Sequence, residues 1–316
     1  MSCDIIFHFL ENRLEISLFF SIRVRTMKVV VTGGSGASGS YVVRELIECG
    51  HEVFNFDRAD MNRVNSLNLP ATNSILADLT DAGQVYDAFA QVRPDAVCHL
   101  AAVPLTYGIS RELVFKNNVI SCYNVLQAAG DLGVKRFISA SSEIVSGWLT
   151  SDALPPQFPF DETVQVPTPN AYGMGKQVGE VMADSMAVRY RDMAIVSLRI
   201  NSVMLPERPE KLLDRRKNYL ETGFWNYWSY IDARDVATAF AVTLEGESQG
   251  HEVFNVASNE TYAPVPLAEA IESYYKVKPN MHESMGPFDS AYDSTKIKRV
   301  FGWSAQHSWR SYPGAQ

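Results

Sequence analysis

Short apolar runs alternate with longer amphipathic segments along most of the chain. The apolar runs predict strands at 27–31, 51–56, 74–77, 96–102, 134–140, 195–200 and 250–256. Helical periodicity predicts helices at 40–49, 81–92, 111–130, 170–190, 267–276 and 294–301, with a further charged helix after residue 200. Apolar strands that alternate with helices indicate a parallel sheet covered on both faces. The expected fold is therefore α/β, a Rossmann-type doubly wound parallel sheet with a smaller C-terminal substrate-binding part.

The first predicted strand leads into a glycine turn. Gly33, Gly36 and Gly39 lie between this strand and the helix at 40–49. Residues without Cβ reach otherwise forbidden backbone angles, and they let a diphosphate approach N–H groups at a helix N-terminus. The next strand ends at Asp57, 21 residues after Gly36, where a carboxylate can bind the ribose hydroxyls of a dinucleotide. This context favours a dinucleotide site over an ordinary glycine-rich turn.

The residues after the second and later strands bear on the choice of cofactor. Asp57 would repel a 2′-phosphate, so we expect NAD; Arg58 could bind that phosphate, which keeps NADP open as the less favoured cofactor. Asp78 either contacts the adenine or belongs to the start of the next helix, whose cap is Asp81 or Thr80. The small pair Ala101 and Ala102 ends a strand where larger side chains would obstruct the cofactor.

The helix predicted at 170–190 carries candidate chemistry. Tyr172 and Lys176 are four residues apart and share one helical face. A phenol with a pKa near 10 is a poor base at neutral pH, and lowering that pKa by about three units requires roughly 4 kcal/mol, which a nearby ammonium favours. The alternative is an unrelated surface pair. Three serines, Ser139, Ser141 and Ser142, lie at the end of the strand at 134–140, where hydroxyls would face the crevice.

Several motifs occur in a fixed order. They are TGGSGASG at 32–39, Asp57, Asp78, HLAA at 99–102, Asn118 in NNVI, SASSEIVSG at 139–147, the Tyr172/Lys176 pair, SLRIN at 197–201, YIDARDVATAF at 230–240 and KIKRVFGW at 296–303. From residue 27 to about residue 309 the chain resembles an extended short-chain dehydrogenase/reductase of the NAD-dependent epimerase/dehydratase type. The resemblance implies that Ser142 polarises the substrate oxygen, that Tyr172 transfers the proton, and that Lys176 holds the nicotinamide ribose and tunes Tyr172. It also implies a structural role for Asn118.

These observations give a set of expected site residues. The catalytic residues are Ser142, Tyr172 and Lys176. The cofactor-binding residues are Gly33, Gly36, Ala37, Ser38, Gly39, Asp57, Arg58, Asp78, Leu79, Leu100, Ala101, Ala102, Asn118, Tyr172 and Lys176. The substrate-binding residues are Ser141, Ser142, Asn201 and Trp228. No metal site is expected.

The chain departs from the family pattern in its substrate region. Relatives that act on nucleotide sugars usually carry a diphosphate-binding arginine where Trp228 and Ser229 stand here, and Ser146 replaces a tyrosine. These departures favour a smaller polyol, sugar or sugar acid. Basic residues at 208 and 215–217 could bind an anion, but we interpret them as a solvated helix face. The aromatic residues at 224–230 either line a sugar-like ligand or are buried between the two parts.

The predicted function is NAD-dependent oxidation of a carbinol in a sugar-like substrate, by hydride transfer with tyrosine as the base. One alternative is a nucleotide-sugar 4-epimerase of the UDP-glucose type, because both reactions begin with the same hydride and proton removal. Another is a non-catalytic dinucleotide-binding sensor. Retention of Ser142, Tyr172 and Lys176 together favours an enzyme, since a sensor needs only the glycine turn.

Composition and net charge limit the kinds of binding partner that we expect. The net charge of −8 argues against nucleic acid or an anionic membrane as the main partner, since both would demand a basic face. Four cysteines without metal-type spacing favour a reducing, cytoplasmic setting, and we also expect a homodimer. We divide the chain into a poorly ordered extension at 1–26, a mainly NAD-binding part at 27–195 and a mainly substrate-binding part at 196–316, which is interleaved with the Rossmann sheet. Charged residues interrupt the apolar pieces of 1–26, so it predicts neither a membrane span nor a signal peptide.

Overall fold

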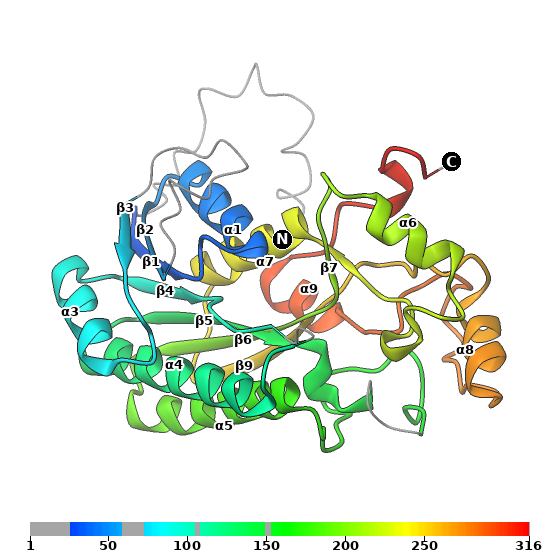
Figure 1. Cartoon of the computed structure of the whole chain (residues 1–316), viewed down its shortest axis with the longest axis horizontal. Coiled ribbons are helices and arrows are strands. Elements are labelled where there is room, and N and C mark those ends of the chain that lie inside the picture. Colours follow the sequence, from blue (N-terminus) through cyan, green and yellow to red (C-terminus); the bar gives the residue numbers. More distant parts are fainter. Residues whose placement is uncertain (1–25, 59–72, 105–107, 149–152, 316) are drawn as a thin grey trace, which may run out of the picture.

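The computed structural model describes residues 26–58, 73–104, 108–148 and 153–315 (Figure 1). The extension expected at 1–26 therefore lies outside the described residues, apart from Thr26. The division of the remaining chain at residue 195 stays a prediction.

A seven-stranded parallel sheet forms the centre of the molecule. Its strands are β1 (Lys28–Thr32), β2 (Glu52–Asp57), β3 (Asn73–Leu76), β4 (Ala96–His99), β5 (Arg136–Ser142), β6 (Ala194–Ile200) and β9 (His251–Val256). Their order is β3-β2-β1-β4-β5-β6-β9, and every pairing is parallel. The strand order reverses between β1 and β4, and a ligand crevice is expected outside the carboxyl ends of the strands at such a point. The predicted fold class and strands are confirmed.

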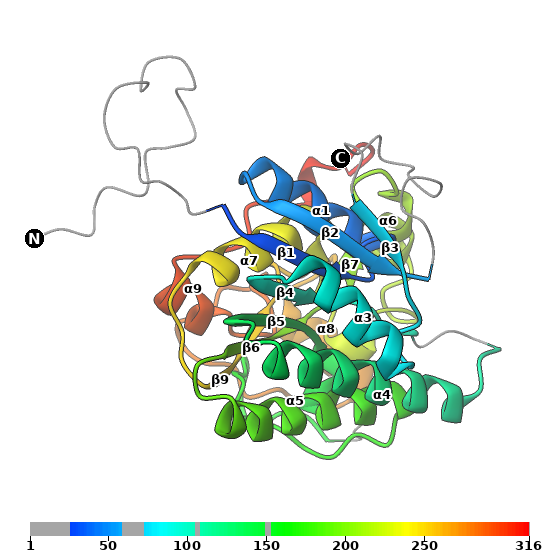
Figure 2. The ribbon, with the colours of Figure 1, turned by 90° about the vertical axis from the view of Figure 1, so that its left-hand side faces the viewer.

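Helices cover both faces of the sheet (Figures 1 and 2). The helices α1 (Ala37–Glu48) and α7 (Ala233–Glu245) share one apolar core with the sheet. The helices α3 (Ala82–Val92), α4 (Arg111–Asp131) and α5 (Ala171–Arg189) share the core on the opposite face. The sequence analysis did not predict α7. Its buried face packs against α1 and the sheet, and includes Val236, Phe240 and Leu244 among several alanines.

A smaller C-terminal part lies beside the carboxyl ends of the strands. It contains β7 (Val203–Met204) paired with β8 (Ile231–Asp232), α6 (Glu210–Lys217) and α8 (Leu267–Tyr275). The helix α9 (Thr295–Phe301) instead packs against β9, in the core that α1 and α7 share with the main sheet. Three 3₁₀ turns complete the described elements: η1 (Glu143–Ser146), η3 (Phe224–Asn226) and η4 (Trp309–Ser311). The core of this C-terminal part is aromatic and includes Phe158, Phe160, Tyr227, Trp228, Tyr230 and Tyr262. Because β9 returns to the main sheet, the two parts are interleaved.

Side-chain caps fix where two site helices begin. Asp81 accepts a hydrogen bond from the Gln84 backbone N–H at 3.1 Å, so Asp81 rather than Thr80 caps α3. Asn170 caps α5 by accepting from the N–H groups of Tyr172 and Gly173, at 2.9 and 3.1 Å. This cap sets the rotation of the first turn of α5 and therefore the direction of Tyr172.

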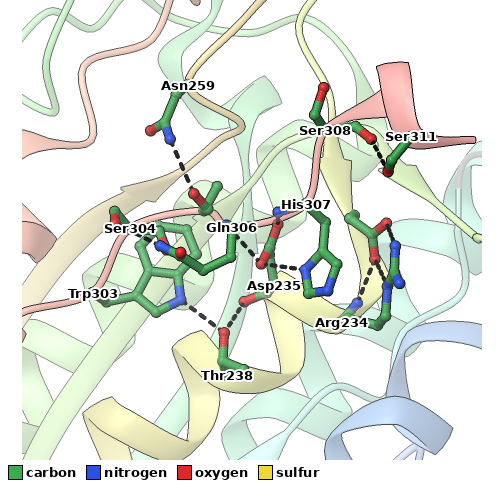
Figure 3. A network of polar contacts seen from close by, with 12 residues as sticks. Arg234, Asp235, Thr238, Asn259, Trp303, Ser304, Gln306, His307, Ser308 and Ser311 are labelled. Atoms are coloured by element: carbon green, nitrogen blue, oxygen red, sulfur yellow. Dashed lines mark hydrogen bonds and ion pairs between the residues drawn. The ribbon is translucent and has the colours of Figure 1, made fainter. Parts of the chain in front are cut away.

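The C-terminal segment is tied to α7 by polar contacts (Figure 3). Asp235 is fully buried and accepts hydrogen bonds from the backbone N–H groups of Gln306 and His307, at 3.0 and 2.9 Å. Nδ1 of His307 lies 2.8 Å from the same carboxylate, and the Trp303 indole donates to Thr238 at 3.0 Å. These bonds satisfy the carboxylate that burial would otherwise penalise.

Within the described part of the chain, no helix combines the length and apolar character that crossing a membrane requires.

Replacing Asp235 with alanine should destabilise the fold. Two backbone N–H groups and the His307 ring would lose their acceptor, so we expect the free energy of unfolding to fall by about 3 kcal/mol in urea denaturation. Asp192→Ala is the control, because that side chain is 88% exposed and its ion pair with Lys135 should contribute less than about 1 kcal/mol. Equal stability of the two variants would contradict the assignment.

Candidate active site

The glycine turn closes tightly against the backbone that follows β4. Gly33 has a φ of +73°, and a Cβ there would lie 2.6 Å from the Ala101 nitrogen. A Cβ at Gly39 would lie 2.1 Å from the Gly33 carbonyl oxygen. At the start of α1, Gly36 supplies no side-chain cap, so the first N–H groups of the helix are suited to an anion. The turn therefore fits the diphosphate of a dinucleotide.

A cavity of about 290 Å³ adjoins this turn. It is lined by Gly33, Ser35, Gly36, Asp57, Arg58, Ala77, Asp78, Leu79, Thr80, Leu100, Ala101, Ala102, Asn117 and Ser121. Nine of these are among the expected cofactor residues; Ala37, Ser38 and Gly39 instead form the first turn of α1. The sequence analysis missed Ser35, Ala77, Thr80, Asn117 and Ser121. The four-residue spacing of Asn117 and Ser121 on α4 is a signal that could have identified both.

Two carboxylates shape one end of the cavity. Asp57 Oδ2 accepts a hydrogen bond from the Ser35 N–H at 3.2 Å. Asp78 Oδ1 accepts from the N–H and hydroxyl of Thr80, at 2.9 and 2.8 Å. Bonds from Thr80 hold the pKa of Asp78 below its ordinary value, and the charge of Arg58 lowers it further. Asp78 therefore organises the cavity wall, while Asp81 caps the helix.

Asn118 fixes the backbone that follows β4, next to the cavity. Its amide oxygen accepts from the Val103 N–H at 2.7 Å, and its amide nitrogen donates to the Val103 carbonyl at 2.9 Å. The side chain is buried, at 5% exposure. This two-point contact fixes the loop after β4 and fits the structural role that the family resemblance implied.

Two of the expected catalytic residues, Tyr172 and Lys176, lie together near the carboxyl end of β5. Nζ of Lys176 donates to the Ala140 carbonyl at 2.5 Å and lies 5.7 Å from the centre of the Tyr172 ring. Ser142, two residues after Ala140, accepts through its hydroxyl oxygen from the Ile144 N–H at 3.4 Å. The Lys176 ammonium thus bridges the end of β5 and the Tyr172 ring.

Ser141 and Ser142 have different surroundings although they are adjacent. Ser141 donates to Glu180 at 2.6 Å, and Glu180 forms a buried ion pair with Arg199 at 2.8 Å. The hydroxyl of Ser141 therefore belongs to this buried polar cluster. Ser142 is the serine whose hydroxyl lies outside the cluster.

The expected substrate residues Asn201 and Trp228 are both buried. Trp228 is fully enclosed, and its indole N–H donates to the Tyr219 carbonyl at 2.7 Å, so it lies in the aromatic core rather than on an accessible wall. Tyr227 and Tyr230 are also fully buried, which favours the burial interpretation for these three aromatics. Asn201 is 2% exposed, and neither atom of its amide has a hydrogen-bond partner among the described residues.

The interpretation of the basic residues near α6 as a solvated face is wrong for two of them. Arg216 donates to the carbonyls of Tyr262 and Ala263, at 2.8 and 2.6 Å, and lies over the Trp309 ring. Arg215 donates to the Ser202 hydroxyl at 3.0 Å. Arg208 and Lys217 are exposed, as expected.

Comparison with known proteins places this site in a family. Residues 29–257 match the model of the NAD dependent epimerase/dehydratase family. UDP-glucose 4-epimerase from Lactobacillus helveticus is 26% identical, over 89% of this chain and 93% of its own length. The dTDP-D-glucose 4,6-dehydratase of Mus musculus is 25% identical, over 89% of this chain and 85% of its own.

Solved structures share the fold. The Bordetella bronchiseptica enzyme WbmG in complex with NAD and UDP has a TM-score of 0.66 at 22% identity, covering 94% of each chain. The UDP-glucose 4-epimerase of Thermus thermophilus in complex with NAD has a TM-score of 0.67 at 24% identity, covering 90% of this chain and 96% of its own. The chain belongs to the NAD dependent epimerase/dehydratase family. The predictions of an enzyme and of NAD as its cofactor are thereby confirmed.

Replacing Asp57 with asparagine should relax the choice between NAD and NADP. The variant keeps an acceptor for the Ser35 N–H but removes the charge that repels a 2′-phosphate. We expect the ratio of NAD to NADP affinity to fall by about tenfold or more in fluorescence titrations, which corresponds to about 1.4 kcal/mol. Asp87→Asn on the exposed face of α3 should leave the ratio unchanged. An unaltered ratio in Asp57→Asn would remove Asp57 from cofactor selection.

Proposed function

We propose that the enzyme oxidises a carbinol in a sugar-like substrate, with Tyr172 as the proton-transfer base. The observation that carries the proposal is the position of Lys176 between the end of β5 and Tyr172. Ser142 would hold the reacting hydroxyl oxygen, and Tyr172 would take its proton. Lys176 would stabilise the phenolate by its charge. NAD, when bound, supplies the hydride acceptor.

What happens to the carbonyl product distinguishes a dehydrogenase from an epimerase. Release of this product with net formation of NADH defines a dehydrogenase, which we favour. Return of the hydride to the opposite face defines an epimerase, and the names of relatives such as UDP-glucose 4-epimerase support this as the second candidate. Absorbance of NADH together with product analysis distinguishes the two outcomes.

Replacing Tyr172 with phenylalanine should abolish oxidation and leave NAD binding nearly intact. Only the proton-transfer oxygen is lost, and general-base catalysis contributes about 10²- to 10⁴-fold to the rate. Tyr123→Phe, on the exposed face of α4, is the matched control and should retain full activity. Sugars, sugar acids and nucleotide sugars would serve as test substrates. If Tyr172→Phe kept a tenth or more of the wild-type activity, Tyr172 would be excluded as the base.

We also propose a homodimer that forms through α4 and α5. These helices lie side by side on one surface (Figure 2). They expose apolar side chains, namely Leu113, Phe115, Ile120 and Tyr123 on α4 and Met174, Val181 and Val188 on α5. Val181 and Val188 are 63% and 73% exposed. Exposed apolar side chains on a packed pair of helices are typical of an interface, and a second copy of the same two helices would cover them symmetrically.

Placing a charge on this surface should dissociate the dimer. We expect light scattering to give the wild-type protein twice the mass of one 35.2 kDa chain, and Val181→Lys the mass of a single chain. Val277→Lys is the control, because Val277 is similarly exposed, at 55%, but follows α8 in the C-terminal part. A single-chain mass for the wild-type protein would overturn the proposal.

We further propose a cytoplasmic location. Cys49, Cys98 and Cys122 are free thiols, which is typical of reducing compartments. The net charge of −8 offers no general attraction for nucleic acid, so the expected partner is a small molecule.

A further inference from the structure

A line of polar side chains leads from the catalytic lysine through the sheet to the outer surface of α5. Lys176 and Ser197 line one internal cavity of about 20 Å³. A polar cavity of this size has room for about one water molecule. Because Ser197 lies on β6, the cavity joins the lysine on α5 to the middle of the sheet.

From Ser197 the hydrogen bonds continue to the surface. Its Oγ lies 2.8 Å from Nε2 of His251, the first residue of β9. Nδ1 of the same ring lies 2.7 Å from the carboxylate of Asp184 on α5. Ser197 and the His251 side chain are 1% and 3% exposed, whereas the Asp184 side chain is 72% exposed. The three groups therefore connect a buried hydroxyl to solvent.

The carboxylate of Asp184 sets the direction in which this chain of hydrogen bonds carries a proton. A carboxylate accepts hydrogen bonds, so Nδ1 of His251 holds the ring hydrogen and Nε2 is the acceptor. The Ser197 hydroxyl then donates to Nε2, and the lone pairs of its oxygen can accept from the cavity. Each donor thus faces outward, from the cavity toward solvent.

Among the described residues, the other titratable groups around the cavity offer no such path. Burial lowers the pKa of His99 to about 3, and the positive charge of Lys176 acts in the same direction. Burial raises the pKa of Cys122 to about 11. Both groups therefore stay neutral near pH 7. Glu180 is engaged in an ion pair at 2.8 Å, which leaves His251 as the route to solvent.

We propose that Ser197, His251 and Asp184 carry the proton of each oxidation from the active site to solvent. This inference rests on the proposed function, because a dehydrogenase releases a proton with each NADH, whereas an epimerase returns the proton to its product. The exit passes through β6 and β9 and ends on the outer face of α5.

The proton is conserved along this route. The substrate hydride goes to NAD, Tyr172 takes the hydroxyl proton, and Lys176 passes a proton to the cavity water as it receives that of Tyr172. The water gives a proton to Ser197 Oγ as Ser197 gives its own to Nε2 of His251. Nδ1 gives its hydrogen to Asp184, which releases it to solvent. Tautomeric exchange of the imidazole then restores the starting arrangement.

The test follows NADH and protons separately in stopped-flow experiments. The full chain is mixed with NAD and with D-glucose, D-glucuronate or UDP-glucose in weak buffer that contains a pH-indicator dye. In the wild-type protein, NADH and protons should appear together. In His251→Gln, the first NADH should form at the wild-type rate, because Tyr172 still takes the proton of the substrate. Proton release should then lag, and kcat should fall by about tenfold or more.

Matched controls separate proton transfer from a structural role. His51→Gln removes another fully buried histidine side chain, which lies 3.2 Å from a glutamate but does not line the cavity, so its two signals should stay together. Asp184→Asn keeps an acceptor for Nδ1 at an exposed position and therefore the fold, but its amide cannot take up a proton, so the lag should appear here too. Asp192→Asn, at an 88% exposed side chain, should show none.

NADH and protons that appear together in both His251→Gln and Asp184→Asn would overturn the inference. So would a lag of equal size in the control variants or in the wild-type protein, and so would the absence of net NADH with all three probes. A lag in either variant without one in its control supports the inference. Failure of the proposed base gives a different result, in which Tyr172→Phe keeps its activity although the lag in His251→Gln persists.

Discussion

The parallel pairing of β1, β4, β5 and β6 is the constraint on which the site depends. Thr32 pairs with His99, His99 with Ser139, and Ser142 with Ile200, so these strands end at one edge of the sheet. The glycine turn, the alanines after β4, Ser142 and Asn201 therefore emerge together although they are far apart in the chain. A slip of one residue in any of these pairings would turn the side chains of that strand to the opposite face.

The cofactor side of the site could be predicted because its determinants are local. A buried strand, a glycine turn and an acidic strand end each leave a short pattern in the sequence, and nine expected residues line the cavity. The helix α7 was not predicted although Val236, Phe240 and Leu244 recur every four residues on its buried face, so its sequence did carry a helical pattern.

The substrate side could be predicted less well because tertiary contacts decide the direction of each side chain. Ser141 and Ser142 have the same chemistry, and only the position of Glu180 on α5 shows which hydroxyl is engaged in the core. In α6, Arg215, Arg216 and Lys217 are consecutive basic residues. Arg215 and Arg216 face inward, where they donate hydrogen bonds to the Ser202 hydroxyl and to the carbonyls at 262 and 263. These acceptors lie outside the helix, so the sequence of α6 alone does not reveal them.

Two buried glutamates near β5 differ in how their carboxyl groups are satisfied. Glu180 is matched by Arg199 at 2.8 Å, so the pair has no net charge, and Ser141 adds a further hydrogen bond. Glu143 has an amide rather than an arginine within hydrogen-bond distance, and burial consequently favours its neutral form. Burial therefore sets the pKa of Glu143, whereas an ion pair satisfies Glu180.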